Sequence, residues 1–168
     1  MSNIKHRHLV KFILFIAVVF VLIIPTGCSK EQDPLPAEFE SLTLDKKLTG
    51  KEAKDFLLRM HQGVVGSDKN EIGFYSGSEG GATIYISYFD DKFIAQDEFK
   101  RMTDKIASGS TEFTNGDIFY IDGLKIYKCL GYSQSHFIFS LENKLFWLTS
   151  ETSIIRKLIS DYLHYLKK

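Results

Sequence analysis

The sequence has 168 residues, of which 44% are hydrophobic, with 21 basic and 21 acidic side chains. A chain of this size and hydrophobic content can form one folded domain without stabilising metals or disulfides. Its balanced charge, with no basic run longer than a lysine pair, argues against nucleic acid as the main partner.

The N-terminal segment has the pattern of an export signal. Lys5, Arg7 and Lys11 precede an apolar run, Phe12–Ile24, and the sequence Pro25–Cys28 follows it directly. The run is shorter than the roughly 20 apolar residues that a membrane-spanning helix needs. We therefore interpret the segment as a cleaved signal, with an uncleaved signal anchor and ordinary secretion as the alternatives.

The end of this segment, Pro25-Thr26-Gly27-Cys28, resembles the lipobox of bacterial lipoprotein precursors, in which cleavage occurs before a lipid-modified cysteine. Pro25 departs from that motif, which usually carries Leu or another aliphatic residue there. The resemblance implies a signal peptide over residues 1–27 and a lipid on Cys28. It also implies a membrane-anchored lipoprotein of the bacterial cell envelope that faces the periplasm or the cell exterior. Ser29, instead of Asp, resembles the pattern that permits outer-membrane sorting.

Cleavage would change the charge and the cysteine content of the chain. Removing residues 1–27 from 168 leaves 141, and three of the 21 basic residues leave with the signal. The remaining 18 basic and 21 acidic residues give a net charge of about −3. A lipid on Cys28 would also leave Cys129 without an intramolecular partner. The apolar strand pattern around Cys129 predicts a buried, unreactive thiol.

Residues 28–47 are predicted to form a lipid-anchored tether, and residues 48–168 a single α+β domain. Pro34 and Pro36 disfavour helix and sheet, and the charged residues around them favour a solvated segment.

The domain is predicted to begin with a helix and a pair of strands. Gly63 ends the helix, whose apolar residues recur at helical spacing: Ala53, Phe56, Leu57 and Met60. Two segments, Glu71–Tyr75 and Ala82–Phe89, then predict strands joined by a glycine-rich loop. Asp90-Asp91 begins a second helix, whose apolar face is formed by Ala95, Phe99, Met102 and Ile106.

Four short strands and a closing helix are predicted in the remainder of the chain. The strands are Asp117–Ile121, Leu124–Leu130, His136–Leu141 and Leu145–Thr149. Their short connections predict an antiparallel meander, with a two-residue turn at Asp122-Gly123 and a longer turn over Gly131–Ser135. A last helix begins at Thr152 and ends near Leu166. The predicted fold is α+β, with a mostly antiparallel sheet of about six strands and three helices in the order α-β-β-α-β-β-β-β-α.

Two histidines are candidate ligands for a metal or haem, because neutral imidazole is the commonest protein metal ligand. His61 lies at the edge of the first helix, and His136 begins an aromatic strand. The structural alternative is that each histidine donates a hydrogen bond to a backbone carbonyl. No cofactor is predicted, and a metal or haem bound by His61 and His136 is the alternative.

The remaining motifs do not indicate catalysis. The loop Ser76–Gly81 lacks the Gly-Lys-Ser/Thr of a phosphate-binding loop and joins two strands, so it is predicted to be a hairpin loop. Asp90-Asp91 is interpreted as a helix cap. Phe146 and Trp147 should point to opposite faces of the sheet, which requires either an exposed aromatic strip or helices on both faces. We predict that the protein is not an enzyme.

Several short motifs together resemble an uncharacterised group of bacterial and archaeal domains over roughly residues 45–150. They are Met60-His61-x-Gly63, Phe99-x-x-Met102, Gly131-Tyr132 ahead of His136-Phe137-x-Phe139, and Leu145-Phe146-Trp147-Leu148. The resemblance favours a shared site for His61 and His136. The group has no assigned activity, so the resemblance implies no function.

The sequence therefore predicts a lipid-anchored envelope domain with a binding or accessory role. Its predicted partners are the membrane, through the lipid on Cys28, and another envelope protein or a small ligand. The alternative is a metal- or haem-binding accessory protein that uses His61 and His136.

Overall fold

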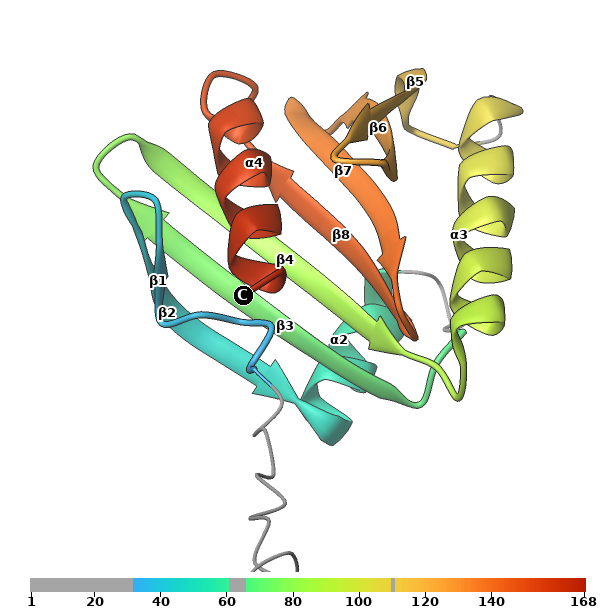
Figure 1. Cartoon of the computed structure of the whole chain (residues 1–168), viewed down its shortest axis with the longest axis horizontal. Coiled ribbons are helices and arrows are strands. Elements are labelled where there is room, and N and C mark those ends of the chain that lie inside the picture. Colours follow the sequence, from blue (N-terminus) through green and yellow to red (C-terminus); the bar gives the residue numbers. More distant parts are fainter. Residues whose placement is uncertain (1–31, 61–65, 110) are drawn as a thin grey trace, which may run out of the picture. The chain divides into compact units, whose positions relative to one another are not determined.

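The computed structural model describes residues 32–60, 66–109 and 111–168. Asp33–Lys168 forms one compact unit. Within these ranges the chain contains eight strands and three helices, labelled as in Figure 1: β1 (Glu38–Phe39), β2 (Leu42–Thr49), α2 (Gly50–Met60), β3 (Lys69–Gly77), β4 (Gly80–Tyr88), α3 (Lys92–Ala107), β5 (Thr114–Ile121), β6 (Leu124–Gly131), β7 (Gln134–Leu141), β8 (Lys144–Ser150) and α4 (Ile155–Leu166). None of these helices is long and apolar enough to cross a membrane.

The eight strands form one antiparallel sheet with the order β1-β2-β3-β4-β8-β7-β6-β5. Strands β1 to β4 make up one half, and the meander from β5 to β8 makes up the other. The halves join where β4 pairs with β8, with Ile84 opposite Leu148. The edge strand β5 therefore ends the sheet on the side of the meander (Figure 1).

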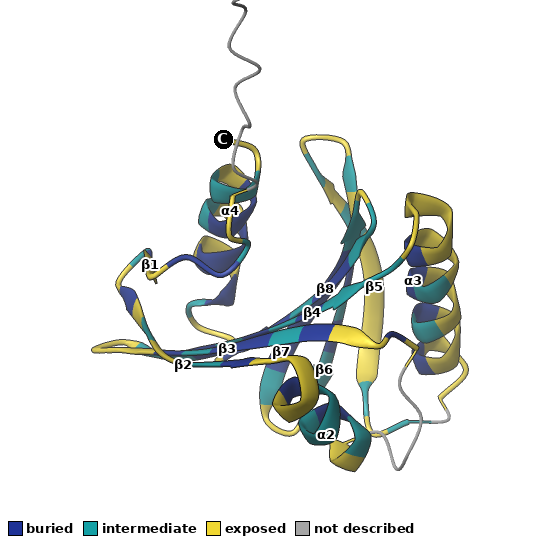
Figure 2. Cartoon of the chain, turned by 90° about the horizontal axis from the view of Figure 1, so that it is seen from below, coloured by how far each residue is buried: buried dark blue, intermediate teal, exposed yellow. Residues whose placement is uncertain are grey.

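Helices cover both faces of the sheet, with α4 on one face and α2 and α3 on the other (Figure 2). The strands are apolar on both sides, since Phe146 packs in the cluster beneath α4 whereas its neighbour Trp147 packs in the cluster beneath α3. The sequence left two arrangements open, an exposed aromatic strip or helices on both faces. The structure has helices on both faces and therefore three layers. Burial on both faces is what the doubly apolar strand pattern requires.

The predicted fold is wrong in the number and order of its strands. The sheet has eight strands instead of about six, because β1 and β2 form before the first helix. The residues assigned to the tether, 28–47, contain β1 and most of β2. The order of elements is therefore β-β-α-β-β-α-β-β-β-β-α.

A β-bulge explains why β2 does not show an alternating pattern. The pairing of β2 with β3 shifts between Leu44 and Lys46, so Asp45 is an extra residue in the strand. The shift reverses which face the following side chains occupy. Leu42 consequently packs in the cluster beneath α4, while Leu48 packs beneath α2 on the opposite face.

The segment before β1 is fixed to the domain by three tyrosine hydroxyls. We call Asp33–Pro36 the strap. Tyr165 donates to the carbonyl of Asp33 and Tyr162 to that of Pro34, each at 2.7 Å, and Tyr75 donates to that of Pro36 at 3.0 Å. Leu35 is buried in the core between these bonds. The strap is therefore part of the folded domain.

Candidate functional site

The turn between β6 and β7 holds two non-glycine residues in the left-handed backbone region. Tyr132 and Ser133 have φ angles of 53° and 62°, and they join the closing pair Gly131 and Gln134. A two-residue hairpin turn of this kind normally uses Asn-Gly, which adopts positive φ easily. Other L-residues lose roughly 1–2 kcal/mol each in this region. Because strained backbone concentrates at functional sites, the turn is the first feature of the candidate site.

Tyr132 is the most exposed large hydrophobic side chain among the described residues, at 71%. Phe113, from the segment before β5, contacts its ring edge-on with the ring centroids 5.7 Å apart. Phe113 also packs on His136 and Trp147, with centroid distances of 4.9 Å and 5.1 Å. A Cβ at Gly131 would lie 2.4 Å from the Phe113 ring, so glycine allows this ring to approach the turn. Phe113 thus connects the exposed tyrosine to the buried ring of His136 and the half-buried ring of Trp147.

His136 connects the turn to the sheet through both of its ring nitrogens. Nε2 lies 2.9 Å from the Gly131 carbonyl, which can only accept, so Nε2 carries the proton. Nδ1 lies 3.0 Å from the indole nitrogen of Trp147, which can only donate, so Nδ1 accepts. The Thr149 hydroxyl lies 2.9 Å from the same Nδ1. The imidazole is therefore neutral, and its bond to Gly131 holds the residue that precedes Tyr132.

The environment of His136 favours this neutral form. The side chain is 4% exposed, and burial lowers the pKa of the imidazole, opposed in part by the hydrogen bond to the Gly131 carbonyl. A metal could bind only if one of the hydrogen bonds were broken. Of the two interpretations of His136, the structure agrees with donation to a backbone carbonyl.

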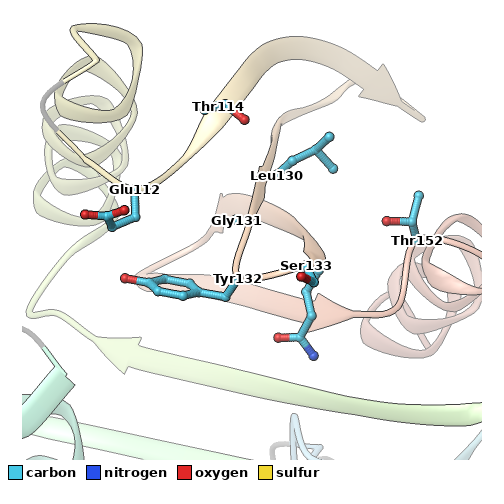
Figure 3. A pocket seen from close by; sticks show the side chains of 8 residues that line it. Glu112, Thr114, Leu130, Gly131, Tyr132, Ser133 and Thr152 are labelled. Atoms are coloured by element: carbon cyan, nitrogen blue, oxygen red, sulfur yellow. The ribbon is translucent and has the colours of Figure 1, made fainter.

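A shallow cleft of about 400 Å³ opens beside the turn. In Figure 3, Tyr132 projects toward the segment that carries Glu112, and Thr152 lies on the other side of the turn, just before α4. The lining residues are Glu112, Thr114, Leu130, Gly131, Tyr132, Ser133, Gln134 and Thr152. Hydroxyl groups, one carboxamide, one carboxylate and an exposed aromatic residue thus line the cleft. This lining offers donors and acceptors to a polar ligand and an apolar ring face to a peptide or protein.

Two of the three site residues predicted from the sequence, Cys28 and His61, lie outside the described residues. Whether His61 approaches His136 is therefore not tested. Among the residues that the structure describes, no three His, Cys, Asp or Glu side chains are grouped as a metal site would require.

The glycine-rich loop forms the turn between β3 and β4. A backbone amide at the end of this loop is bound by the carboxylate of Glu151. The amide of Gly81 donates to Oε2 of Glu151 at 3.1 Å, and the hydroxyl of Ser150 donates to the Gly81 carbonyl at 2.6 Å. Hydrogen bonds from its own backbone amide, from the Gly81 amide and from the Ser150 hydroxyl lower the pKa of the Glu151 carboxyl, opposed in part by burial. The loop region thus connects β4 to the start of the segment that leads into α4.

Two further predictions are confirmed. Cys129 is buried among apolar side chains, and burial raises the pKa of its thiol to about 12, as expected of an unreactive cysteine. Asp91 caps α3, since its carboxylate accepts from the amides of Phe93 and Ile94 at 2.7 Å and 3.0 Å.

Most of the candidate site was missed by sequence reasoning. The segment Gly131–Ser135 was predicted as a longer turn, whereas the structure forms a two-residue turn at Tyr132-Ser133. This pair has neither the glycine nor the asparagine typical of such a turn. One signal for a short turn was available in the sequence. Tyr132-Ser133 lies between two apolar runs, and few residues separate it from either run. Phe113 belongs to a polar segment in which no periodicity marks it. Thr152 was assigned to the last helix, which in the structure begins only at Ile155.

No protein-family model, curated protein or solved structure in the comparisons matches this chain.

Proposed function

We propose that this protein is a lipid-anchored component of the bacterial cell envelope that binds another envelope protein or a small ligand at the β6–β7 turn, without catalysis. The observation that carries the binding proposal is the exposed, strained pair Tyr132-Ser133 at the edge of the cleft.

The energetics of the turn support this proposal. Folding alone would be served better by Asn-Gly, which forms the same turn with less strain. The chain instead places a tyrosine there, and Tyr132 exposes most of its ring to solvent. Tyrosine provides a large, rigid contact area at low cost in side-chain entropy, which is why it is enriched in binding surfaces.

The supporting contacts beneath the turn also suit a binding surface. His136 holds the Gly131 carbonyl, and Phe113 contacts both the His136 and Tyr132 rings. These contacts restrict where the Tyr132 ring can go before any partner arrives. A side chain ordered in advance loses less entropy on association.

The lipid anchor rests on the sequence Pro25–Cys28. It is tested by metabolic labelling with an alkyne fatty acid and by mass spectrometry of the N-terminal peptide. The expected result is a lipid on Cys28, and loss of label and of membrane association in Cys28→Ala. A Cys28→Ala protein that still fractionates with the membrane would contradict the lipid anchor and indicate an uncleaved signal anchor.

The binding surface is tested by site-specific photocrosslinking in the native host. A benzophenone amino acid is placed at Tyr132, and in a separate variant at Tyr120, which is 64% exposed on the edge strand β5 and is not among the residues lining the cleft. A protein partner should give a discrete adduct from position 132 and not from position 120. The same adducts from both positions would contradict a specific surface at the turn.

A small ligand is tested by the fluorescence of Trp147, the single tryptophan of the chain. Trp147 contacts Phe113 and His136, so a compound that moves Phe113 should change its emission. An envelope extract of small molecules should produce a saturable change in the wild type that is lost in Tyr132→Ala. If neither crosslinks nor a fluorescence change occurred, the proposed binding role of the turn would be wrong.

A further inference from the structure

The distance between the proposed lipid and the folded domain is limited by the covalent chain. Asp33 is the first residue of the strap, and Cys28 precedes it by five positions. Five residues span at most about 17 Å when fully extended. A lipid on Cys28 would therefore place Asp33 no farther than about 17 Å from the attachment point.

The strap cannot lengthen this connection without breaking contacts in the domain. Tyr162 is fully buried, and its hydroxyl donates to the Pro34 carbonyl at 2.7 Å. Leu35 is 2% exposed. Releasing these residues would expose the apolar Leu35 side chain and remove the hydrogen-bond partner of the Tyr162 hydroxyl, and both changes are unfavourable.

After the strap, the chain runs along α4 from the C-terminal end of that helix toward its N-terminal end. The contacts follow in order: Tyr165 with Asp33, Tyr162 with Pro34 and Phe39, and Lys157 with Glu40. Asp33 thus lies at the C-terminal end of α4, close to the C-terminus of the chain (Figure 1).

The cleft lies at the opposite end of the same helix. Thr152 lines the cleft and precedes Ile155, the first residue of α4. It is bonded to Ser135 at 2.8 Å, two residues after the β6–β7 turn. A helix of 12 residues is about 18 Å long. Asp33, which is bonded to Tyr165 near the C-terminal end of α4, and Thr152 are therefore separated by roughly the length of this helix.

Two lysines near the strap are paired with carboxylates. The Lys47 ammonium lies 2.9 Å from Asp33 and 3.1 Å from Glu71, and that of Lys167 lies 2.8 Å from Asp122. Neither sign of charge dominates these contacts, so the surface could approach headgroups without strong repulsion.

We infer that the end of the domain formed by the strap and the last turn of α4 lies against the membrane that holds the Cys28 lipid, and that the cleft faces away from this membrane. The inference rests on the proposed lipid anchor. It follows from the short connection, the fixed strap and the position of the cleft at the other end of α4. In this arrangement the cleft is accessible to partners in solution or on an opposing membrane.

The test measures which end of the domain is near the lipid. A fluorophore is attached to Lys168→Cys or Ser78→Cys in the full-length, lipidated protein, reconstituted in phosphatidylcholine vesicles that contain headgroup nitroxides. Lys168 is exposed at the end with the strap. Ser78 is exposed in the β3–β4 turn, far from the strap. Glu71, which shares Lys47 with Asp33, marks the strap end of β3. Gly77, next to Ser78, lies six residues or about 20 Å farther along this strand. Cys129 stays unlabelled because it is buried.

We expect the dye at position 168 to be quenched at least twofold more than the dye at position 78. Equal quenching at the two positions, or stronger quenching at position 78, would overturn the orientation. Mass spectrometry of the same samples separates the two proposals. An unmodified Cys28 would contradict the anchor, whereas a lipidated protein with equal quenching would contradict only the orientation.

A matched variant tests whether the short connection is the cause. Fifteen Gly/Ser residues are inserted between Lys30 and Glu31, outside the described residues. A flexible connection of about 20 residues has a root-mean-square reach of roughly 25 Å, so the domain should rotate more freely. The quenching difference should then fall below twofold. A difference that persists would show that the length of the connection does not set the orientation.

Discussion

Replacing Ser133 with glycine should stabilise the protein, because it removes strain from the β6–β7 turn while leaving Tyr132 in place. Ser133 has a φ angle of 62°, a conformation that glycine adopts without a steric penalty. The hairpin pairing on either side, Gly131 with Gln134 and Leu130 with Ser135, requires no change. The substitution therefore tests the strain on which the proposed function depends.

The expected magnitude follows from two opposing effects. Relief of the left-handed conformation contributes roughly 1–2 kcal/mol. The larger conformational entropy of glycine in the unfolded chain removes roughly 0.5–1 kcal/mol of this gain. The free energy of unfolding should therefore rise by about 0.5–1 kcal/mol, or about 2–4 °C in Tm for a domain of this size.

Ser78→Gly is the matched control, since it makes the same substitution in another exposed hairpin turn. Ser78 is not among the described residues with positive φ, so glycine brings only its entropic cost and should destabilise by about 0.5–1 kcal/mol. Both variants are measured by urea unfolding of the chain without its predicted signal and with Cys28→Ser. Two variants that change stability in the same direction, or a Ser133→Gly protein no more stable than the wild type, would refute the strain argument.

Three other predictions concern buried groups. Burial lowers the pKa of His136 in the folded state, whereas in the unfolded chain the imidazole has its ordinary pKa near 6.5. Below that pH the unfolded chain therefore binds a proton at His136 more readily than the folded protein does. Stability should therefore fall as the pH drops from about 7 to 5. At pH 7.5, His136→Gln should lower the free energy of unfolding, measured in urea, by about 1–3 kcal/mol. The stability of this variant should also fall less steeply between pH 7 and 5 than that of the wild type. An unchanged pH dependence would mean that other groups cause the loss of stability. Cys129, whose thiol pKa is raised to about 12 by burial, should react with a thiol reagent at pH 8 at least a hundredfold more slowly in the native protein than in urea, and equal rates would contradict its burial. Tyr162→Phe should lose about 1–2 kcal/mol in urea unfolding, because the Tyr162 side chain is fully buried and its hydroxyl bond to the strap is partly buried. Tyr165→Phe removes an exposed bond and should lose under about 0.5 kcal/mol. Equal losses would show that burial does not determine the contribution of these bonds.

Local chemistry made part of the fold predictable from the sequence. Asp122-Gly123 was predicted as a two-residue turn, and both residues have positive φ, at 48° and 78°. The strands that flank it, β5 and β6, pair as that turn requires, with Ile121 opposite Leu124. In such a segment the turn residues and the apolar runs depend only on neighbours in sequence, so one sequence carries enough information.

The missed features depend on residues that are distant in sequence. The strap was interpreted as solvated because Pro34 and Pro36 cannot continue a strand ladder. Their carbonyls can still accept hydrogen bonds, and the donors come from Tyr162 and Tyr75. The donor to Pro34 lies 128 positions away in the chain, a distance at which neither spacing nor periodicity is informative.

The candidate site was missed for a related reason. For His136 the sequence left a ligand and a backbone hydrogen bond open, because its partners Trp147 and Gly131 come within hydrogen-bonding distance only through the pairing of β7 with its neighbours. Tyr132 in turn breaks the local rule for two-residue turns. Departures from local preference are where function is expected, since the cost of such residues must be offset by other contacts.

The position of α4 gives Asp33 of the strap and the proposed binding surface a fixed separation. The helix packs on the sheet along its length through Ile155, Leu158, Ile159 and Tyr162, so its two ends cannot move independently without opening the core. A partner at the cleft would therefore bind one end of a rigid domain. The other end of this domain is connected through the strap to the proposed anchor. Domains joined to an anchor by a long flexible linker lack this coupling, because the linker absorbs any rotation. Here the distance between membrane and partner would be determined by the fold, and the five residues from Cys28 to Asp33 would leave little range around it.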